Sequence, residues 1–232
     1  MKKISIQNVE IEFLCDVNVD LMVLGGRVPS CEWLRSIDFY NKIWAVDKGI
    51  DICSLANIKA DFLIGDGDSA DCKNWNDAKN YGAKVYSYPV EKDLTDFQLA
   101  LDLYDSEQNE LSTDNKLFLT GAWGGRFDHL WSLFISALNS HRIPIGIADE
   151  RETIIFLNGE SSLHLAFDKK PLSFSLISFS QISTGITTDG LKWELENFNL
   201  EYKNPFSISN EVLERTVDVS LKSGQIGVYW YW

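Results

Sequence analysis

The stretch "FLIGDGDSAD", residues 62–71, places an apolar run directly before three aspartates. The run is continuous rather than alternating, which is typical of a strand buried on both faces of a parallel sheet. Asp66 and Asp68 follow this run, and two carboxylates so close together repel each other and resist ionisation. The stretch therefore predicts a buried strand that ends in an acidic loop, which is either solvated or arranged around a cation.

Similar apolar runs occur on both sides of this stretch, and segments with helical spacing separate most of them. The other runs cover residues 19–26, 42–47, 83–89, 116–121 and 144–149. The clearest helical segment is "DHLWSLFISALNS" (128–140), whose apolar residues recur at intervals of three and four. Strands that alternate with helices predict an α/β fold, a mostly parallel sheet with helices on both faces. Residues 4–13 alternate more strictly and predict an extra antiparallel strand.

The pattern changes after about residue 150. From there the chain contains short apolar runs broken by Gly, Pro, Asn and Ser-Gly turn signals, and no segment has convincing helical spacing. We therefore expect two domains, an α/β domain of residues 1–149 and a small all-β domain of residues 150–232.

The composition is that of an ordinary globular protein, and its charge restricts the partners. The 232 residues carry a formal net charge of −13. Such an acidic surface repels nucleic acid and anionic membranes, so neither is expected as a partner. No apolar run is long enough to span a bilayer, and polar residues interrupt the start, "MKKISIQNVEIEFLC", where a signal peptide would need an apolar core. We expect a cytoplasmic protein.

Charged side chains follow the ends of several predicted strands. In order along the chain they are Asp47, Asp66 and Asp68, Asp93 and Asp96, then Arg126 and Asp128. Ligands of open α/β sheets bind outside the carboxyl ends of the strands, where these residues would meet. Mg²⁺ binds carboxylate oxygens and completes its shell with water and substrate phosphates. The sequence therefore favours a magnesium site at this edge.

The segment "KDLTDFQLAL" (92–101) allows two interpretations. Asp93 and Asp96 are three residues apart, so they would share one face at the start of a helix. Asp93 would then serve as the N-cap, and Asp96 would be favourable in the first turn. Helix capping and a functional role remain equally open for both residues.

Two glycine-rich segments follow predicted strands. In "TGAWGGRFDHL" (120–130), Gly124 and Gly125 allow close approach of the backbone to a ligand, and the fork of Arg126 suits phosphate oxygens. Asp128 is either functional or the N-cap of the following helix. "LGGRV" (24–28) lacks the spacing of a dinucleotide-binding motif. It either contacts phosphate or is only a tight turn with Arg27 as a surface charge, and we favour the tight turn.

The β region contributes two candidate segments. Trp193 in "GLKWELENF" is either a core residue or a platform on which a flat ring stacks. Ser207, Ser209 and Asn210 in "FSISN" offer several donors and acceptors within four positions. An ordinary turn beside a core tryptophan is the alternative interpretation.

Taken in order, five motifs resemble the thiamine pyrophosphokinase family. They are "GDGDS" (65–69), "DLTD" (93–96), "GAWGGRFDH" (121–129), "GLKW" (190–193) and "SISN" (207–210). The resemblance extends from about residue 20 to the end of the chain. The sequence departs from the family pattern at Lys48, where many members have glycine, and at Leu99, where many have lysine.

The resemblance implies a fold, a reaction and a set of site residues. Family members are homodimers in which an α/β domain precedes a β-sandwich domain, with sites between the subunits. They transfer a pyrophosphoryl group from ATP to the hydroxyl of thiamine, with Mg²⁺ as cofactor, and release AMP. Carried over by motif, the metal ligands would be Asp66, Asp68, Asp93 and Asp96, which with Arg126 and Asp128 form the catalytic set. ATP would be bound by Asp47, Gly124, Gly125 and Arg126, and thiamine by Trp193, Ser207, Ser209 and Asn210.

Three other functions remain open from the sequence. The same transfer to a hydroxymethyl pterin would use another flat bicyclic acceptor. A noncatalytic thiamine-binding protein would explain the changes at Lys48 and Leu99, although it would leave the acidic residues without a purpose. A magnesium-dependent phosphohydrolase is the third.

Overall fold

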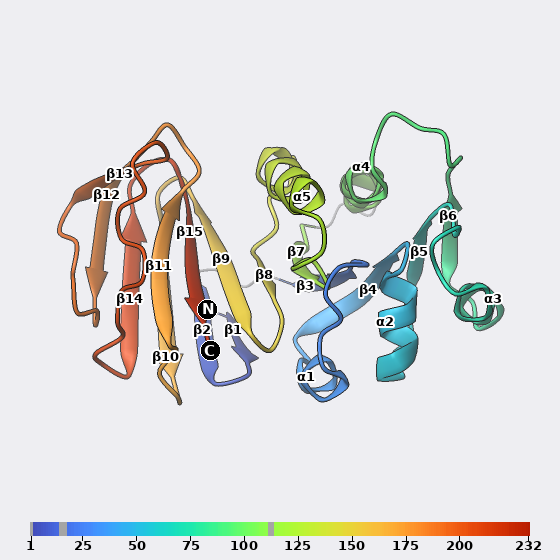
Figure 1. The fold of residues 1–232 in the computed structure, drawn as a ribbon, viewed down its shortest axis with the longest axis horizontal. Coiled ribbons are helices and arrows are strands. Elements are labelled where there is room, and N and C mark those ends of the chain that lie inside the picture. The colour runs from blue at the N-terminus through green and yellow to red at the C-terminus, as the bar shows by residue number, and fades with distance from the viewer. Residues whose placement is uncertain (1, 14–17, 111–113) are drawn as a thin grey trace. The chain divides into compact units, whose positions relative to one another are not determined.

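The structure, a computed structural model, describes residues 2–13, 18–110 and 114–232. The chain forms two compact units, which are described separately (Figure 1). The α/β unit spans Val17–Asp149, and the β unit combines Met1–Asp16 with Glu150–Trp232.

The α/β unit contains a parallel sheet in the order β8-β7-β3-β4-β5-β6. In chain order these strands are β3 (Val19–Val23), β4 (Tyr40–Val46), β5 (Phe62–Gly65), β6 (Lys84–Ser87), β7 (Lys116–Thr120) and β8 (Gly146–Ala148). Each lies within the range expected from the apolar runs or within two residues of it. Every residue of β3 is buried, as its continuous apolar run predicts.

Within the described residues, five helices cover the two faces of this sheet. They are α1 (Cys31–Ser36), α2 (Gly49–Ala56), α3 (Cys72–Asn80), α4 (Asp96–Glu110) and α5 (Phe127–Asn139). Helices α4 and α5 lie on one face, and α1, α2 and α3 lie on the other (Figure 1). Helix α5 confirms the predicted helix over 128–140 to within one residue at each end. Among the helices of the described residues, none is long and apolar enough to cross a membrane.

The β unit is a sandwich of antiparallel strands. One layer has the order β1-β2-β10-β14-β12-β13, and the other joins β11, β15 and β9. The strands are β1 (Lys2–Ile6), β2 (Val9–Phe13), β9 (Glu152–Asn158), β10 (Ser161–Phe167), β11 (Ser173–Ser178), β12 (Ile182–Asp189), β13 (Phe198–Glu201), β14 (Thr216–Leu221) and β15 (Gln225–Tyr231). Phe167 of β10 meets Trp230 of β15 edge to face across the core, with ring centroids 5.8 Å apart. As expected, no helix occurs in residues 150–232.

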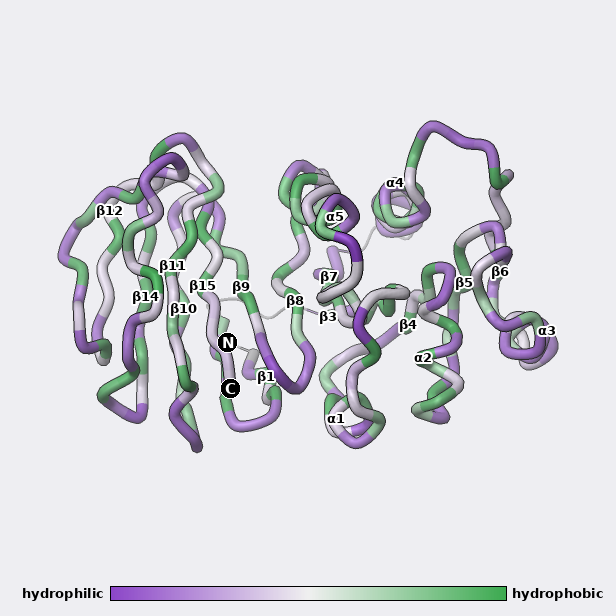
Figure 2. The backbone as a smooth tube through the Cα atoms, in the orientation of Figure 1, coloured by the Kyte–Doolittle hydropathy of each residue, from purple (hydrophilic) through white to green (hydrophobic). Residues whose placement is uncertain are grey.

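Hydropathy follows the layers of each unit. Figure 2 shows apolar residues along the strands and hydrophilic residues in most connecting turns. In β10 the buried residues Leu163, Leu165 and Phe167 alternate with more exposed ones, the pattern of a strand with one face on the core.

The N-terminal residues differ from our expectation. We placed them in the α/β domain as one extra strand, whereas β1 and β2 form a hairpin that joins the β unit. Strand β2 pairs antiparallel with β10, with Ile11 opposite Leu165. The strict alternation of residues 4–13 indicates a strand with one solvated face, which suits an antiparallel layer. The partner strand lies about 150 residues away along the chain, and local patterning cannot reveal it.

Candidate active site

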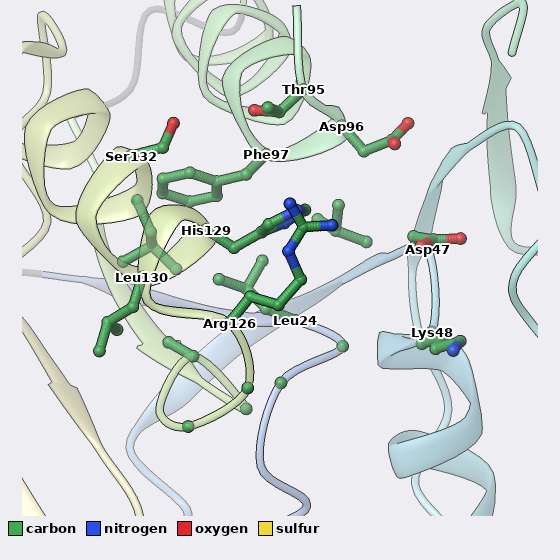
Figure 3. A pocket seen from close by; sticks show the side chains of 18 of the residues that line it. Leu24, Asp47, Lys48, Thr95, Asp96, Phe97, Arg126, His129, Leu130 and Ser132 are labelled. Atoms are coloured by element: carbon green, nitrogen blue, oxygen red, sulfur yellow. The ribbon is translucent and has the colours of Figure 1, made fainter.

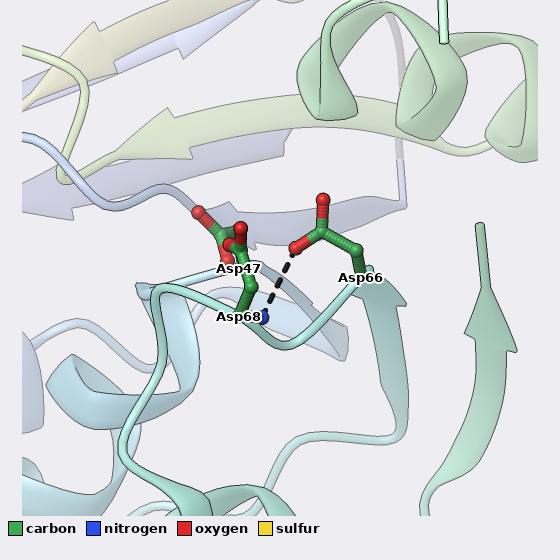
Figure 4. Close-up of side chains that lie close together, drawn as sticks. All are labelled: Asp47, Asp66 and Asp68. Carbon is green, nitrogen blue, oxygen red and sulfur yellow. Dashed lines mark hydrogen bonds between the residues drawn. The ribbon is translucent and has the colours of Figure 1, made fainter. Parts of the chain in front are cut away.

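Three aspartates meet at the carboxyl edge of the parallel sheet. Asp47 follows β4, and Asp66 and Asp68 follow the neighbouring strand β5. One carboxylate oxygen from each residue lies within 4.8 Å of the other two (Figure 4). The strand ends bring them together because β4 and β5 are adjacent and parallel, so both end at the same edge.

Asp47 is held in an unusual backbone conformation. Its φ of 49° lies in the left-handed region, which aspartate and asparagine tolerate better than most residues. The backbone N–H donates to Ile64 O at 2.8 Å, and Ser69 Oγ donates to Oδ2. Oδ1 is buried and has no hydrogen-bond partner among the described residues. A buried carboxylate oxygen without a donor is costly, and a cation would satisfy it.

Asp66 and Asp68 have environments that separate their pKa values. Asp66 Oδ1 accepts from the backbone N–H of Asp68 at 3.0 Å (Figure 4), and Oδ2 accepts from Lys92 Nζ at 2.9 Å. The hydrogen bond from Lys92 lowers the pKa of Asp66. Hydrogen bonding with the carboxyl group of Asp66 raises the pKa of Asp68. Two like charges this close cannot both ionise easily unless a cation is bound between them.

The donor set at this edge fits Mg²⁺. It offers three carboxylates, one of them with an unpartnered buried oxygen, and no sulfur or nitrogen ligand. Of the four expected metal ligands, the structure brings Asp66 and Asp68 into this set. It adds Asp47, which we had expected to bind ATP. The sequence could have indicated Asp47 as a metal ligand, because it follows β4 and so lies at the same edge of the sheet as the other acids.

Asp93 does not cap helix α4, so that interpretation is wrong. Thr95 Oγ1 accepts from the backbone N–H of Gln98 at 3.3 Å, and Gln98 Oε1 accepts from the backbone N–H of Thr95 at 2.9 Å. This reciprocal pair is a capping box. Asp93 is exposed and precedes the cap, outside the three-aspartate group. The sequence contains the capping-box pattern "TDFQ" (95–98), but Asp93 is also a common N-cap residue and was preferred.

Asp96 is the first residue of α4, and a lysine links it to the acidic edge. Burial raises the pKa of the Asp96 carboxyl. Lys92 Nζ lies 3.2 Å from Asp96 Oδ1 and also binds Asp66. Burial lowers the pKa of Lys92, but its hydrogen bond to Asp66 and its ion pair with Asp96 outweigh burial and raise the pKa overall. The sequence does not single out Lys92, because beside Glu91, Asp93 and Asp96 it resembles an ordinary surface charge.

The two glycine-rich loops are joined by backbone hydrogen bonds. Gly26 N–H donates to Gly121 O, and Arg27 N–H donates to Trp123 O, both at 2.6 Å. A Cβ atom on Gly26 would lie 2.6 Å from Gly121 O, so only glycine permits this approach. The "LGGRV" segment therefore does form a tight turn, and that turn supports the second loop.

Arg27 is not a surface charge, in contrast to our expectation. Its Nε and Nη2 atoms lie 2.7 and 2.6 Å from Asp149 Oδ2, and the Asp149 side chain is only 1% exposed. The pair connects the first glycine-rich loop to the end of β8. A buried carboxylate requires such a partner, which the sequence could not identify across 122 positions.

The second glycine-rich loop leads into α5 with an exposed ion pair. Gly124 and Gly125 have φ of 73° and 72°, a region that favours glycine. Arg126 occupies the N-cap position, so the alternative that Asp128 is the N-cap is wrong. Arg126 Nε and Nη2 contact the two oxygens of Asp128 at 3.1 and 2.5 Å. The hydrogen bonds from Arg126 lower the pKa of Asp128. This bidentate geometry is also the one that suits a phosphate.

A cavity of about 720 Å³ lies between these loops within the α/β unit. Both glycine-rich loops line it, together with Asp47, Lys48, Asp96 and Arg126. Figure 3 shows Arg126 projecting across it, with Asp47 and Lys48 on one side and Asp96 above. Its volume is within the range of small-molecule and cofactor sites.

The residues of the β unit that were expected to bind thiamine differ in their exposure to solvent. Trp193 is 55% exposed, which excludes the core interpretation. Ser207 and Ser209 both have positive φ, 63° and 60°, in an exposed segment. These three side chains are accessible to a ligand.

Asn210 is buried, and its side chain is already occupied. Its Nδ2 donates to Trp193 O at 2.8 Å, and its Oδ1 accepts from the backbone N–H groups of Trp193 at 3.2 Å and Glu211 at 2.8 Å. We expected Asn210 to contact a substrate. In the structure it instead fixes the backbone that carries Trp193.

Fold and site together define a class: α/β proteins that gather carboxylates and glycine-rich loops at one edge of a parallel sheet, combined with an antiparallel β unit. Two family models match the chain. Thiamin pyrophosphokinase, catalytic domain, matches residues 35–146, and thiamin pyrophosphokinase, vitamin B1 binding domain, matches residues 163–226. The chain belongs to the thiamine pyrophosphokinase family.

Individual relatives agree with this assignment. The chain is 31% identical over 166 residues to thiamin pyrophosphokinase 1 of Caenorhabditis elegans, a match that covers 69% of this chain and 65% of the relative. It is 28% identical over 208 residues to thiamine pyrophosphokinase of Bacillus subtilis, covering 88% of this chain and 94% of that protein.

Solved structures of the family share the fold. The crystal structure of thiamine pyrophosphokinase from Bacillus subtilis has a TM-score of 0.77 at 23% identity, covering 92% of this chain and 99% of that one. Yeast thiamin pyrophosphokinase has a TM-score of 0.71 at 14% identity, covering 93% and 87%. The predicted fold class, a mostly parallel α/β part and an antiparallel β part, is confirmed.

Proposed function

We propose that this protein is an ATP-dependent thiamine diphosphokinase. It transfers the β- and γ-phosphoryl groups of ATP as one unit to the hydroxyl of thiamine and releases AMP. The observation that carries the proposal is the cavity of about 720 Å³ that combines Asp47, Asp96 and Arg126 with glycine-rich loops. Matches to both the catalytic and the vitamin B1 binding family models support the same reaction.

The phosphates of ATP would lie along the edge of the cavity. Gly124 and Gly125 let the backbone approach them closely, and Arg126 exchanges its exposed partner Asp128 for phosphate oxygens. Asp47, Asp66 and Asp68 would hold the Mg²⁺ ion. When bound there, Mg²⁺ neutralises charge that develops on the phosphate oxygens during transfer.

Positioning and electrostatics account for most of the expected catalysis. Arg126 stabilises negative charge on the transferred group, and a carboxylate of the cluster accepts the proton of the thiamine hydroxyl. Transfer breaks the bond between the α,β-bridging oxygen and the β-phosphorus, so that oxygen leaves with AMP. The thiamine oxygen forms the new bond to the β-phosphorus.

We further propose that Trp193, Ser207 and Ser209 bind thiamine and that the protein acts as a homodimer with sites shared between subunits. The exposure of these side chains supports the first part. Acids, glycines and aliphatic side chains line most of the α/β cavity, and its rings are those of Phe97 and His129. Trp193 of the β unit would add a larger exposed platform, which is the argument for the second part. We also propose a cytoplasmic location, where ATP is available.

An acceptor assay tests the reaction. The protein is incubated with ATP and Mg²⁺, with thiamine, with a hydroxymethyl pterin, or without an acceptor. We expect AMP to form only with thiamine. If AMP forms with the pterin instead, the acceptor is a pterin and not thiamine. Free phosphate without an acceptor would indicate a phosphohydrolase. Thiamine binding without any product would indicate a noncatalytic protein.

Subunit mixing tests the shared site. Asp68→Asn and Trp193→Ala proteins are combined under conditions that allow subunit exchange and are assayed at a thiamine concentration well below the KM of the Trp193→Ala protein, where both variants are impaired. Shared sites predict partial recovery of activity, because some sites then receive an intact half from each variant. No recovery after verified exchange, or full activity in a monomer, would reject the shared-site proposal.

A further inference from the structure

Lys92 is largely enclosed by the acidic edge of the sheet. Its side chain is 14% exposed although it lies in the loop between β6 and α4. Nζ donates to Asp66 Oδ2 at 2.9 Å and to Pro89 O at 3.0 Å, and it lies 3.2 Å from Asp96 Oδ1. The ammonium therefore makes two hydrogen bonds and one ion pair, because Asp96 Oδ1 accepts no hydrogen bond among the described residues.

The carboxylates near Lys92 repel one another. Asp47, Asp66 and Asp68 each place one carboxylate oxygen within 4.8 Å of the other two. Asp96 joins them through Lys92, whose Nζ lies 3.2 Å from Asp96 Oδ1 and 2.9 Å from Asp66 Oδ2. Four carboxylates in mutual electrostatic contact are costly without a compensating cation.

Lys92 also fixes the orientation of Asp66. That side chain is 8% exposed, with Oδ2 held by Lys92 and Oδ1 held by the backbone N–H of Asp68. Asp47 Oδ1 and Asp96 Oδ1 are both buried without a hydrogen bond among the described residues, but only Asp96 Oδ1 has Lys92 as an ion-pair partner. The ammonium therefore binds one side of the cluster and leaves Asp47 for a second cation.

We propose that Lys92 is a built-in counter-ion of the metal site, a positioning residue that keeps Asp66 and Asp96 together before a divalent cation binds. Its charge also opposes that cation, so the protein alone binds Mg²⁺ weakly and retains it firmly only together with nucleotide phosphates. The inference rests on the proposed function only for the identity of the metal that binds with the nucleotide. The repulsion between Lys92 and a bound cation depends on the residues of this chain alone.

Binding of Mn²⁺ to the full chain, without ATP or thiamine, tests the inference. Lys92→Met keeps the length of the side chain and removes its charge. We expect the dissociation constant for Mn²⁺ to fall on the order of tenfold, because a positive charge close to the metal is lost. We also expect a lower melting temperature in EDTA and a larger rise on adding Mn²⁺ than in the unmodified protein. Unchanged or weaker Mn²⁺ binding would overturn the proposal.

Two single variants serve as controls. Lys92→Arg keeps the positive charge near the metal and should leave the Mn²⁺ affinity within about twofold of the unmodified value. Lys84→Met removes a lysine that pairs with Glu107 at 2.6 Å, at the opposite end of β6 from the acidic edge. It should leave Mn²⁺ affinity unchanged. If Lys84→Met tightens Mn²⁺ binding as much as Lys92→Met does, general charge reduction explains the effect and the proposal fails.

A double variant separates charge balance from simple loss of structure. Lys92→Met combined with Asp96→Asn removes one positive and one negative charge, so the melting temperature in EDTA should recover most of the value lost in Lys92→Met. No recovery would reject the counter-ion role, even if Lys92→Met alone folds poorly. Because no substrate is present, these results do not depend on the acceptor assay. If the acceptor assay fails, the proposed function is wrong, but the counter-ion role of Lys92 can still be tested by Mn²⁺ binding.

Discussion

The acidic edge of the α/β unit and the Trp193 segment of the β unit were both predicted to bind substrates, but their hydrogen bonding differs. At the acidic edge, Asp47 Oδ1 is buried without a donor among the described residues. In the β unit, both functional groups of the buried Asn210 amide are occupied by backbone atoms. The unpartnered carboxylate oxygen marks the first region as a place for a ligand, whereas three hydrogen bonds to the backbone mark Asn210 as support for the Trp193 segment.

The comparison also separates residues within each region. Asp66 and Asp68 converge on Asp47, whereas Asp93 is exposed outside the group. Trp193 is exposed, whereas the residue that holds it is buried. A motif therefore contains residues that would contact a ligand and residues that hold the others, and substitutions should distinguish the two.

The largest effect is expected from Asp68→Asn, which keeps the size of the side chain and removes its charge. Loss of one metal-binding carboxylate should lower turnover about a hundredfold or more, while the circular dichroism spectrum stays unchanged. Asp93→Asn is the matched control and should lose less than about tenfold. Near-normal turnover in Asp68→Asn, or an equal loss in Asp93→Asn, would contradict the assignment.

Arg126→Lys tests the glycine-rich loop of the same region. Lysine keeps the charge but cannot form the two parallel contacts that Arg126 makes with Asp128. We expect turnover to fall about tenfold to a hundredfold, with no change in melting temperature, because both partners are exposed. An unchanged rate would identify Arg126 as a surface residue and the loop as only a turn.

Asn210→Ala should affect stability first. Removal of a buried amide that makes three hydrogen bonds should lower the free energy of unfolding by about 2–3 kcal/mol, measured by denaturant titration. Ser209→Ala, at a neighbouring exposed position, should leave stability unchanged and raise the KM for thiamine. If Asn210→Ala is as stable as the unmodified protein, then Asn210 does not support the Trp193 segment.

Trp193→Ala should produce the smallest and most selective change. Loss of the aromatic platform should raise the KM for thiamine roughly tenfold and leave the KM for ATP and the melting temperature unchanged. This outcome would separate acceptor binding in the β unit from chemistry in the α/β unit. A fall in kcat at saturating thiamine, with KM unchanged, would instead place Trp193 in the chemical step.

Much of the fold and part of the site follow from the sequence. Continuous apolar runs indicate the parallel strands, and the acids after residues 46 and 65 indicate the edge where they meet. The β1–β2 hairpin was misplaced because its partner strand β10 is remote in sequence. The pairing of Arg27 with Asp149 was also missed because the two residues are far apart in the sequence.

Other features depend on how hydrogen bonds are distributed, which a sequence does not show. "SISN" suggests side chains that are accessible to a ligand, yet Asn210 is buried and makes three side-chain hydrogen bonds to the backbone. In the sequence Lys92 is a single positive charge in an acidic loop, whereas in the structure it forms ion pairs with both Asp66 and Asp96. Residue type gives the capacity for an interaction, and the fold decides whether that capacity is already used.

The most direct test of the proposed reaction is the fate of the β-phosphoryl group. ATP labelled at the β-phosphorus is incubated with Mg²⁺, thiamine and the protein, and the products are separated. Pyrophosphoryl transfer predicts the label in thiamine diphosphate, with an equal amount of unlabelled AMP. Label recovered in ADP or in free phosphate, with no labelled thiamine diphosphate, would contradict the account.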